Sequence, residues 1–285
     1  MYFSAFTIFA LIGAALMIVG DAYRWRRFCW AAPLLVLFVL LSQPCLRLLP
    51  SVSYDNVLLV ADYRLGYDFG LGRAIGEALA IRLVYAMLPV AVAIVYLLLD
   101  SDHRKRFGFA MLLAGVVAPF FYAICPAAGP MYVFGDAFPF HPPTVKAIPF
   151  AAPGLTMNAV PSGHLAWALL LWWHSRPCLL GVRIVAGLFF VGTAVATLAT
   201  GEHYLVDLVV AIPFAVAVDA AIGRRWISSG AYAAVVLLWC LALRAGLLSG
   251  LSPFVAIPLA AATVLAPLVH RALTEKRLGV LHERL

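Results

Sequence analysis

Residues 201–222 read GEHYLVDLVVAIPFAVAVDAAI and combine the two features that decide what kind of protein this chain is. From Tyr204 onward the stretch is apolar and about 20 residues long, which suffices to cross the ~30 Å hydrocarbon core of a bilayer as a helix. At its start, His203 and Asp207 are four residues apart, so on a helix they share one face. The stretch therefore predicts a membrane-spanning helix with polar chemistry at one end.

Similar apolar stretches recur along the whole chain. Of its 285 residues, 65% are hydrophobic and 12% are charged, against roughly a quarter charged in ordinary soluble domains. A water-soluble fold of this length could not cover its surface with so few polar groups. We therefore expect a single all-α integral membrane domain, residues 1–285, built as a polytopic transmembrane helical bundle. About nine spans are expected: 2–20, 28–49, 77–99, 107–125, 161–175, 181–200, 204–222, 230–249 and 254–270.

The net charge of +7 could by itself suggest a nucleic-acid partner, but the basic residues cluster at every second junction between spans. Fourteen of the 20 Lys and Arg fall on this one side: Arg24, Arg26, Arg27, Arg104, Lys105, Arg106, Arg176, Arg183, Arg224, Arg225, Arg271, Lys276, Arg277 and Arg284. The positive-inside rule makes this side cytoplasmic. We therefore expect the N-terminus outside, the C-terminus inside and no nucleic-acid partner.

Two outer segments, residues 50–76 and 126–160, are long enough to contribute to a functional site. The first carries several charged residues among aromatics and glycines, and the second is rich in proline and aromatic residues. This composition is typical of an ordered or interfacial loop. Unusually long loops are often functional, although a simple connection is the alternative.

A second polar motif, Pro161-Ser162-Gly163-His164, opens the span expected at 161–175. Proline suits the first turn of a helix, where its missing N–H would be unsatisfied anyway. The next N–H groups, together with the Ser162 hydroxyl, could then form a cradle for an anion such as phosphate. His164 would lie at the rim of this cradle and exchange a proton.

His203 and Asp207 form the other half of the candidate site. A carboxylate that accepts a hydrogen bond from one imidazole nitrogen fixes the tautomer and leaves the other nitrogen basic, and His203 could itself be a nucleophile. The partner also explains Asp207, because an unpaired carboxylate one turn into a span is costly. The alternative is an ordinary interfacial histidine. Because the charge pattern puts both motifs on the same outer face, we favour a catalytic or phosphate-binding site.

The two motifs together resemble the second and third signature motifs of the type 2 phosphatidic acid phosphatase (PAP2) superfamily. The resemblance covers about residues 120–222 and implies a PAP2-like six-helix catalytic core, which we assign to residues 107–222. It implies that His203 attacks phosphorus, Asp207 orients it, and His164 protonates the leaving group.

The same resemblance implies that Ser162 and Gly163 contact phosphate oxygens. It implies neither a metal nor another cofactor.

The sequence departs from the superfamily pattern in two places. No stretch fits the first motif, K-x6-R-P, and Ala196 and Thr197 stand where the third motif has S-R. The E-H-Y-x2-D motif at residues 202–207 and the segment from Cys125 to Pro130 are instead similar to one branch of the superfamily. This branch contains sphingomyelin synthases and Aur1-type inositol phosphorylceramide synthases. Those enzymes move a phospho-headgroup from a phospholipid to another lipid alcohol.

A phosphate site still needs positive charge, and few basic residues are expected outside. Arg82, Lys146 and Arg244 are the candidates, although Arg82 could instead pair with Glu77 or Asp68. For Glu202 we expect a supporting role or a contact with a substrate hydroxyl.

Three interpretations of function remain open. The first is a phosphotransferase that acts between lipids at the outer leaflet, with a phospholipid or lipid phosphate as donor and a lipid alcohol as acceptor. The second is a lipid phosphate phosphatase that acts with water on phosphatidate, sphingoid phosphates or polyprenyl phosphates. The third is a non-catalytic lipid transporter or binder. In each case we expect a bacterial inner (plasma) membrane, with the site facing the periplasm or exterior.

Overall fold

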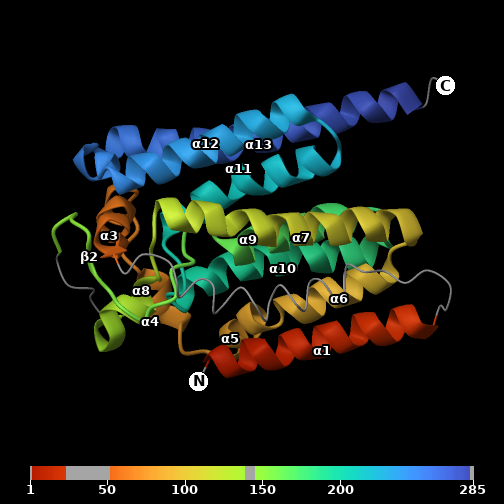
Figure 1. Ribbon diagram of the computed structural model, residues 1–285, viewed down its shortest axis with the longest axis horizontal. Coiled ribbons are helices and arrows are strands. Elements are labelled where there is room, and N and C mark those ends of the chain that lie inside the picture. The colour runs from red at the N-terminus through yellow and green to blue at the C-terminus, as the bar shows by residue number, and fades with distance from the viewer. Residues whose placement is uncertain (1, 24–51, 139–144, 283–285) are drawn as a thin grey trace.

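A computed structural model describes residues 2–23, 52–138 and 145–282, and within these ranges the chain is mostly helical. Its longer helices run side by side, while short elements gather at one end (Figure 1). The longer helices are α1 (Tyr2–Tyr23), α6 (Leu88–Leu98), α7 (Ser101–Ile124), α9 (Gly163–His174), α10 (Leu180–Ala199), α11 (Leu205–Ile222), α12 (Trp226–Arg244) and α13 (Pro253–His282).

The short elements form a cap over one end of the bundle. They are β1 (Val52–Ser53), α3 (Asp55–Arg64), α4 (Gly70–Ile75), α5 (Leu79–Ala86), α8 (Pro130–Phe134), η1 (Gly135–Ala137), β2 (Phe150–Ala151) and η2 (Leu247–Gly250). The two strands pair antiparallel, with Val52 opposite Ala151, and thereby join the segments 50–76 and 126–160. Part of the first segment is therefore helical and not an extended loop.

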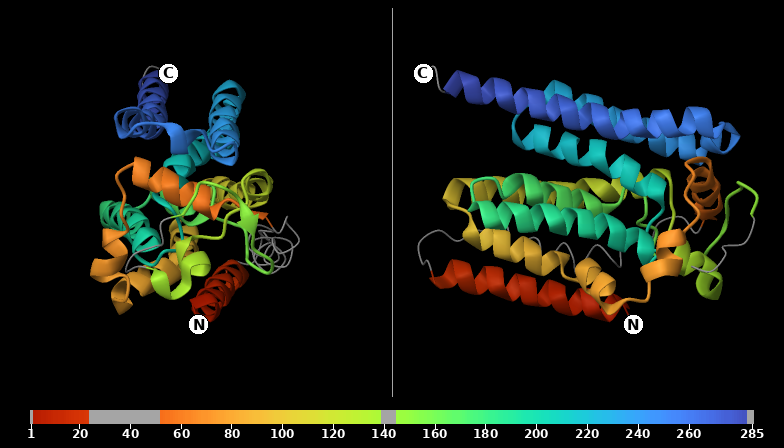
Figure 2. Two further views of the ribbon diagram at one scale, coloured as in Figure 1. Left: turned by 90° about the vertical axis from the view of Figure 1, so that its left-hand side faces the viewer. Right: turned by 180° about the vertical axis from the view of Figure 1, so that it is seen from behind.

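Helix α11 is the centre of the bundle. Its apolar residues face every direction, as is typical of a helix buried on all sides, and nearly all of them are buried. It packs against α7 and α9 on one side and against α12 and α13 on the other. The views in Figure 2 show the same layering from the end and from behind. The stretch that carries His203 and Asp207 thus enters the middle of the protein.

The prediction of nine spans is not confirmed. Among the described residues, five helices are long and apolar enough to cross a membrane: α7, α10, α11, α12 and most of α13. The expected span 28–49 lies outside the described residues, and α1 contributes only a shorter apolar stretch, Ile8–Val19. Helix α9 has 12 residues and begins two residues later than expected. The external position of the N-terminus stays a prediction.

The span expected at 77–99 is broken into α5 and α6, which meet at an angle of 51°. Pro89 lies in the first turn of α6, where a proline is tolerated because no N–H is required there. Helix α6 packs along α1, whereas α5 packs against α10. The break therefore turns α5 toward the cap end of α10.

A cluster of charged side chains joins four helices at the end of the bundle opposite the cap. Asp219 of α11 accepts hydrogen bonds from Arg225 (2.8 Å) and from Arg271 of α13 (3.1 Å). His174, the last residue of α9, has its Nε2 3.6 Å from the same carboxylate. The Arg271 guanidinium also lies 3.9 Å from the centre of the Trp173 ring.

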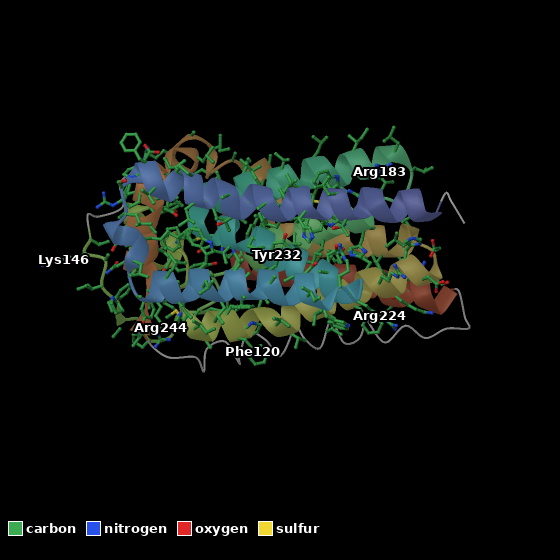
Figure 3. All side chains as sticks on the ribbon, turned by 90° about the horizontal axis from the view of Figure 1, so that it is seen from above. Phe120, Lys146, Arg183, Arg224, Tyr232 and Arg244 are labelled. Carbon is green, nitrogen blue, oxygen red and sulfur yellow. The ribbon has the colours of Figure 1, made fainter. Side chains whose placement is uncertain are left out.

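The two ends of the bundle carry different sets of basic residues. Figure 3 shows Lys146 and Arg244 at one end and Arg183 and Arg224 at the other. This separation agrees with the sides to which the sequence assigns these four residues. Which end faces the cytoplasm stays a prediction.

We predict that Asp219→Ala destabilises the protein, because it leaves two largely buried guanidinium groups without their carboxylate partner. Removing one partner of such a pair costs about 3 kcal/mol, which thermal unfolding of the purified protein in detergent would measure. The control is Asp102→Ala, which removes an exposed pair with Lys105 and should have little effect. Equal melting temperatures of the two variants would contradict the role of the cluster.

Candidate active site

The segment around Ser162 forms the start of α9. Ser162 is the N-cap residue, and its hydroxyl accepts a hydrogen bond from the N–H of Leu165 (3.3 Å), as serine commonly does at this position. Pro161 precedes the cap and is not in the first helical turn, which corrects the sequence-based expectation. The Ser162 N–H donates to the carbonyl oxygen of Asp207 (3.2 Å). The Ser162 N–H therefore does not take part in the expected cradle, whose other members are the N–H groups of Gly163 and His164 and the Ser162 hydroxyl.

His203 and Asp207 face each other at the start of α11. The distance between His203 Nδ1 and Asp207 Oδ2 is 3.3 Å, and both side chains are buried. The same carboxylate oxygen accepts the N–H of Tyr204 (2.8 Å). With Nδ1 directed toward the carboxylate, His203 Nε2 is the nitrogen left for chemistry.

The two histidine motifs meet in the folded chain. The ring centres of His164 and His203 are 6.3 Å apart, and the Ser162–Asp207 backbone bond joins the two motifs directly. At this distance both rings could contact the same tetrahedral group. This arrangement suits a reaction in which one histidine attacks and the other exchanges a proton.

Two tyrosines of the cap, Tyr85 and Tyr132, contact His164 and Glu202. The Tyr85 ring of α5 stacks on His164 with centres 4.1 Å apart, and its hydroxyl lies 3.3 Å from His164 Nδ1. The Tyr85 hydroxyl also donates to Glu202 (3.3 Å), and the Tyr132 hydroxyl of α8 donates to the same oxygen (2.7 Å). If Tyr85 donates to Glu202, it accepts from His164, which sets the proton of His164 on Nδ1.

Glu202 is buried, and burial raises the pKa of its carboxyl group above the usual value. Three neighbours act in the opposite direction: the hydrogen bond from Tyr132, the proximity of His203 and the hydrogen bond from Tyr85. These neighbours favour the ionised form. Glu202 thus accepts hydrogen bonds from α5 and α8, which fits the supporting role that the sequence suggested.

Asp55 links three segments at the cap end of the bundle. Its carboxylate accepts the N–H groups of Ala128 and Gly129 (both 2.9 Å) and the hydroxyl of Tyr204 (2.8 Å), as well as the hydroxyl of Ser53. Burial raises the pKa of Asp55 and these hydrogen bonds lower it. The carboxylate therefore connects α3 to the segment before α8 and to the residue after His203.

Gly129 is required for this connection. Its φ of +111° is a conformation that residues with a Cβ rarely adopt. A Cβ here would also lie 2.3 Å from the carbonyl oxygen of Glu202. The close approach lets the N–H of Met131 donate to Gly201 (2.9 Å). The segment from Cys125 to Pro130 thus packs directly on the backbone that positions His203.

Asp62 caps the start of α11. Its two carboxylate oxygens accept the N–H groups of Leu205 (2.7 Å) and Val206 (2.9 Å), the first two residues of α11. These donors have no partner within their own helix, and a carboxylate there also interacts favourably with the helix dipole. Burial nevertheless raises the pKa of Asp62 well above its usual value.

The three candidate cations have different surroundings. Arg82 pairs with Glu77, as the alternative interpretation expected, yet it lies one turn before Tyr85 on α5 and so shares a face with it. Arg244 donates to the carbonyl oxygen of Ile124 (2.9 Å) and lies over the ring of Tyr54. Lys146 is exposed in the segment before β2. Arg82 is therefore the cation whose helix contacts the site directly.

Sequence reasoning missed Tyr85, Tyr132 and Tyr204 and assigned no role to Asp55 or Asp62. The aspartates carried a usable signal, since charged residues in a short stretch between spans need partners. Among the described residues, no group of three or more histidine, cysteine or acidic side chains could hold a metal ion.

Comparisons with known proteins give one result. A sequence model described as PAP2 superfamily matches residues 74–221, about half of the chain. The matched part begins at α4 and ends in α11, so it includes Tyr85 as well as both histidine motifs. Neither the curated proteins nor the solved structures contain a match to the chain.

We predict that Asp62→Ala weakens both folding and activity, because two buried N–H groups at the start of α11 lose their acceptor. The loss of hydrogen bonds to a charged group should cost about 2 kcal/mol, measurable by thermal unfolding. Asp68→Ala is the matched control, because Asp68 is an exposed residue of the same segment that pairs with Arg73. If both variants behaved like the unchanged protein, Asp62 would not support the site.

We predict that Tyr132→Phe moves the acidic limb of the activity profile to higher pH. Without this hydroxyl, the Glu202 carboxylate loses a hydrogen bond that lowers its pKa, so its protonated form persists to higher pH. The turnover rate measured across a pH series would show the shift. The control is Tyr63→Phe, which changes an exposed tyrosine of α3 and should leave the profile in place; an unshifted Tyr132→Phe profile would contradict the prediction.

Proposed function

Because this chain belongs to the PAP2 superfamily, we propose that it is a membrane-embedded phosphotransferase that moves a phospho-headgroup between lipids at the outer leaflet. Membership of the superfamily suggests a lipid phosphatase or phosphotransferase. The observation that carries the proposal is the pair of rings of His164 and His203, 6.3 Å apart. The first stacks on Tyr85 of the cap, and the second bonds to Asp207 of α11. The proposed intermediate is a phosphohistidine.

In the first step, Nε2 of His203 attacks the phosphorus of the donor lipid, and the bond from phosphorus to the leaving oxygen breaks. Asp207 stabilises the positive charge that develops on the imidazole ring. His164, protonated on both nitrogens, gives its Nε2 proton to the leaving oxygen. In this role His164 Nδ1 keeps its contact with the Tyr85 hydroxyl, and the negative charge of the bound phosphate group favours the charged form of His164.

In the second step, the hydroxyl of the acceptor attacks the phosphohistidine and the N–P bond breaks. The acceptor proton passes to Nε2 of His164, which restores the starting state of both histidines. The N–H groups of Gly163 and His164, at the start of α9, are suited to negative charge on the phosphoryl oxygens. Arg82 is our first candidate for the remaining charge compensation, ahead of Lys146 and Arg244.

The surroundings of Ala196 and Thr197 support a transferase of the divergent branch. Both positions are fully buried in α10, and the Thr197 hydroxyl bonds to the backbone of its own helix. The phosphate group therefore depends on neutral donors and histidines more than on a cluster of guanidinium groups. Such a site suits a phosphodiester, which carries less negative charge than a phosphate monoester.

The superfamily match itself favours a second candidate, a lipid phosphate phosphatase. In that case water replaces the lipid hydroxyl in the second step, and the first step is unchanged. Incubation with a lipid donor labelled in its phosphate and with a lipid alcohol separates the two reactions. A new labelled phospholipid supports the transferase, whereas labelled free phosphate alone supports the phosphatase.

We predict that His203→Ala abolishes turnover and that Asp207→Asn lowers kcat by a factor on the order of 10³, because the imidazole loses its orienting charge. An acid-labile phosphohistidine should be trapped in the unchanged protein and be absent from His203→Ala. His270→Ala is the control, because this exposed histidine bonds to Tyr232 far from the cap. Full turnover by His203→Ala would contradict the mechanism and would favour a transporter or lipid binder.

A further inference from the structure

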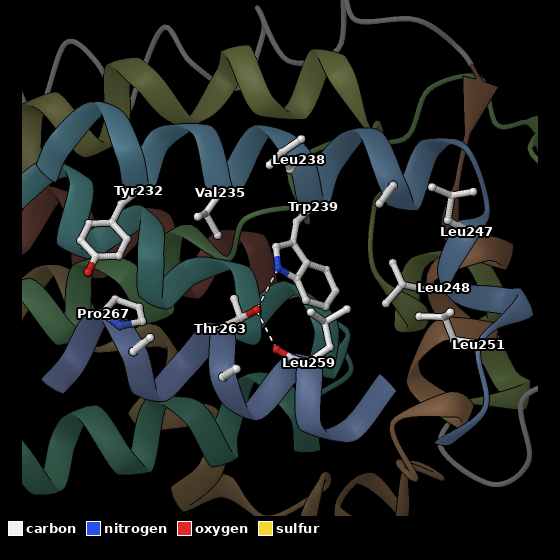
Figure 4. Close-up of a pocket in the computed structure, with 13 residues that line it drawn as sticks. Tyr232, Val235, Leu238, Trp239, Leu247, Leu248, Leu251, Leu259, Thr263 and Pro267 are labelled. Atoms are coloured by element: carbon white, nitrogen blue, oxygen red, sulfur yellow. Dashed lines mark hydrogen bonds between the residues drawn. The ribbon is translucent and has the colours of Figure 1, made fainter. Parts of the chain in front are cut away.

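A long apolar groove lies between α12 and α13 (Figure 4), two helices that pack on the side of α11 away from the histidines (Figure 1). Its volume is about 590 Å³, within the range of ligand-binding clefts. Leu238 and Ala242 line one wall, and Ala262 and Ala266 line the other. The groove is therefore a surface for a hydrocarbon ligand.

The groove exists because a spacer separates the two helices. Small facing residues such as Ala262 and Ala266 normally let membrane helices approach closely. Here the ring of Trp239 stands between the helices, and its Nε1 donates to the Thr263 hydroxyl (3.0 Å), as Figure 4 shows. Thr263 in turn donates to the carbonyl oxygen of Leu259 (2.8 Å). The spacing is thus fixed by hydrogen bonds.

The dimensions of the groove exclude a helix and admit an alkyl chain. On α12 the lining runs from Tyr232 to Ala242, about 15 Å of helix axis, which is half of the ~30 Å hydrocarbon core. Divided by this length, the volume gives a cross-section of about 39 Å². A helix needs roughly 80 Å², whereas a chain whose carbons contact neighbours at about 4 Å needs roughly 16 Å².

A cation lies at the outer mouth of the groove. The turn that closes this end is η2, and Arg64 Nε donates to the carbonyl oxygen of Ser249 within it (3.1 Å). Among the described residues, no carboxylate forms an ion pair with Arg64. A guanidinium group in this position suits a phosphate group at the membrane surface. At the inner end, Tyr232 bonds to His270 (2.8 Å).

We propose that this groove binds a resident phospholipid of the outer leaflet, with one acyl chain between α12 and α13 and its phosphate at Arg64. This lipid is not the reacting one, because α11 separates the groove from the two histidines. Arg64 belongs to α3, the helix whose Asp62 caps α11. The bound lipid therefore stabilises the position of α3, and it does so from the side of α11 that faces away from the two histidines.

The experiment compares phospholipid retention by three forms of the full chain, purified in detergent and analysed by native mass spectrometry after incubation with phosphatidylglycerol. Ala262→Phe fills the groove and should lower retention about tenfold, equivalent to about 1.4 kcal/mol. Ala261→Phe adds the same ring at the adjacent exposed position, which does not line the groove, and should retain lipid normally. Arg64→Gln should weaken retention of phosphatidylglycerol more than that of an uncharged diacylglycerol.

The His203→Ala protein should retain the lipid like the unchanged chain, so the result does not depend on the proposed reaction. Size-exclusion chromatography checks that each variant remains folded. Equal retention by Ala261→Phe and Ala262→Phe would overturn the proposal. Loss of a dimer in Ala262→Phe without loss of lipid would also overturn it, and would identify a second copy as the occupant.

Discussion

The candidate site depends on two buried carboxylates that accept hydrogen bonds from backbone N–H groups. Burying a carboxylate costs several kcal/mol unless strong hydrogen bonds compensate. Asp55 and Asp62 receive such bonds from residues 128–129 and 205–206, on two segments that are distant in sequence. One short helix, α3, thereby joins the start of α11 to the loop before α8. The geometry of both histidine motifs follows from this junction, because the start of α9 is itself bonded to α11 at Asp207.

The charge distribution around the histidines is unusual for a phosphate site. The nearest charged partners of His203 and His164 are the carboxylates of Asp207 and, through Tyr85, Glu202. In the proposed reaction both histidines exchange protons, so they can themselves provide positive charge beside a transferring phosphoryl group. That charge appears and disappears with proton transfer. A fixed arginine cluster would instead bind the phosphate group with similar strength at every stage.

The sequence predicted the helical membrane class, both histidine motifs and their approach, because these depend on local periodicity and on charge at helix junctions. Its count of nine spans is not confirmed, since an apolar run such as 77–99 does not reveal the bend before Pro89 and α9 has 12 residues. It missed Tyr85 and Tyr132 because a tyrosine in an apolar helix carries no signal of its partner. It also left Asp55 and Asp62 without roles, since their partners are backbone N–H groups, which no residue type identifies.

The charged cluster around Asp219 also bears on how the chain is assembled in the membrane. Helices enter in order of synthesis, and α11 brings Asp219 in before Arg271 of α13 exists. Until then, Arg225 at the start of α12 is the neighbour in sequence that can neutralise this carboxylate. Only the arrival of α13 completes the cluster and lets Arg271 stack on Trp173. Helix α13 therefore fixes the position of α11 only after both helices have been inserted.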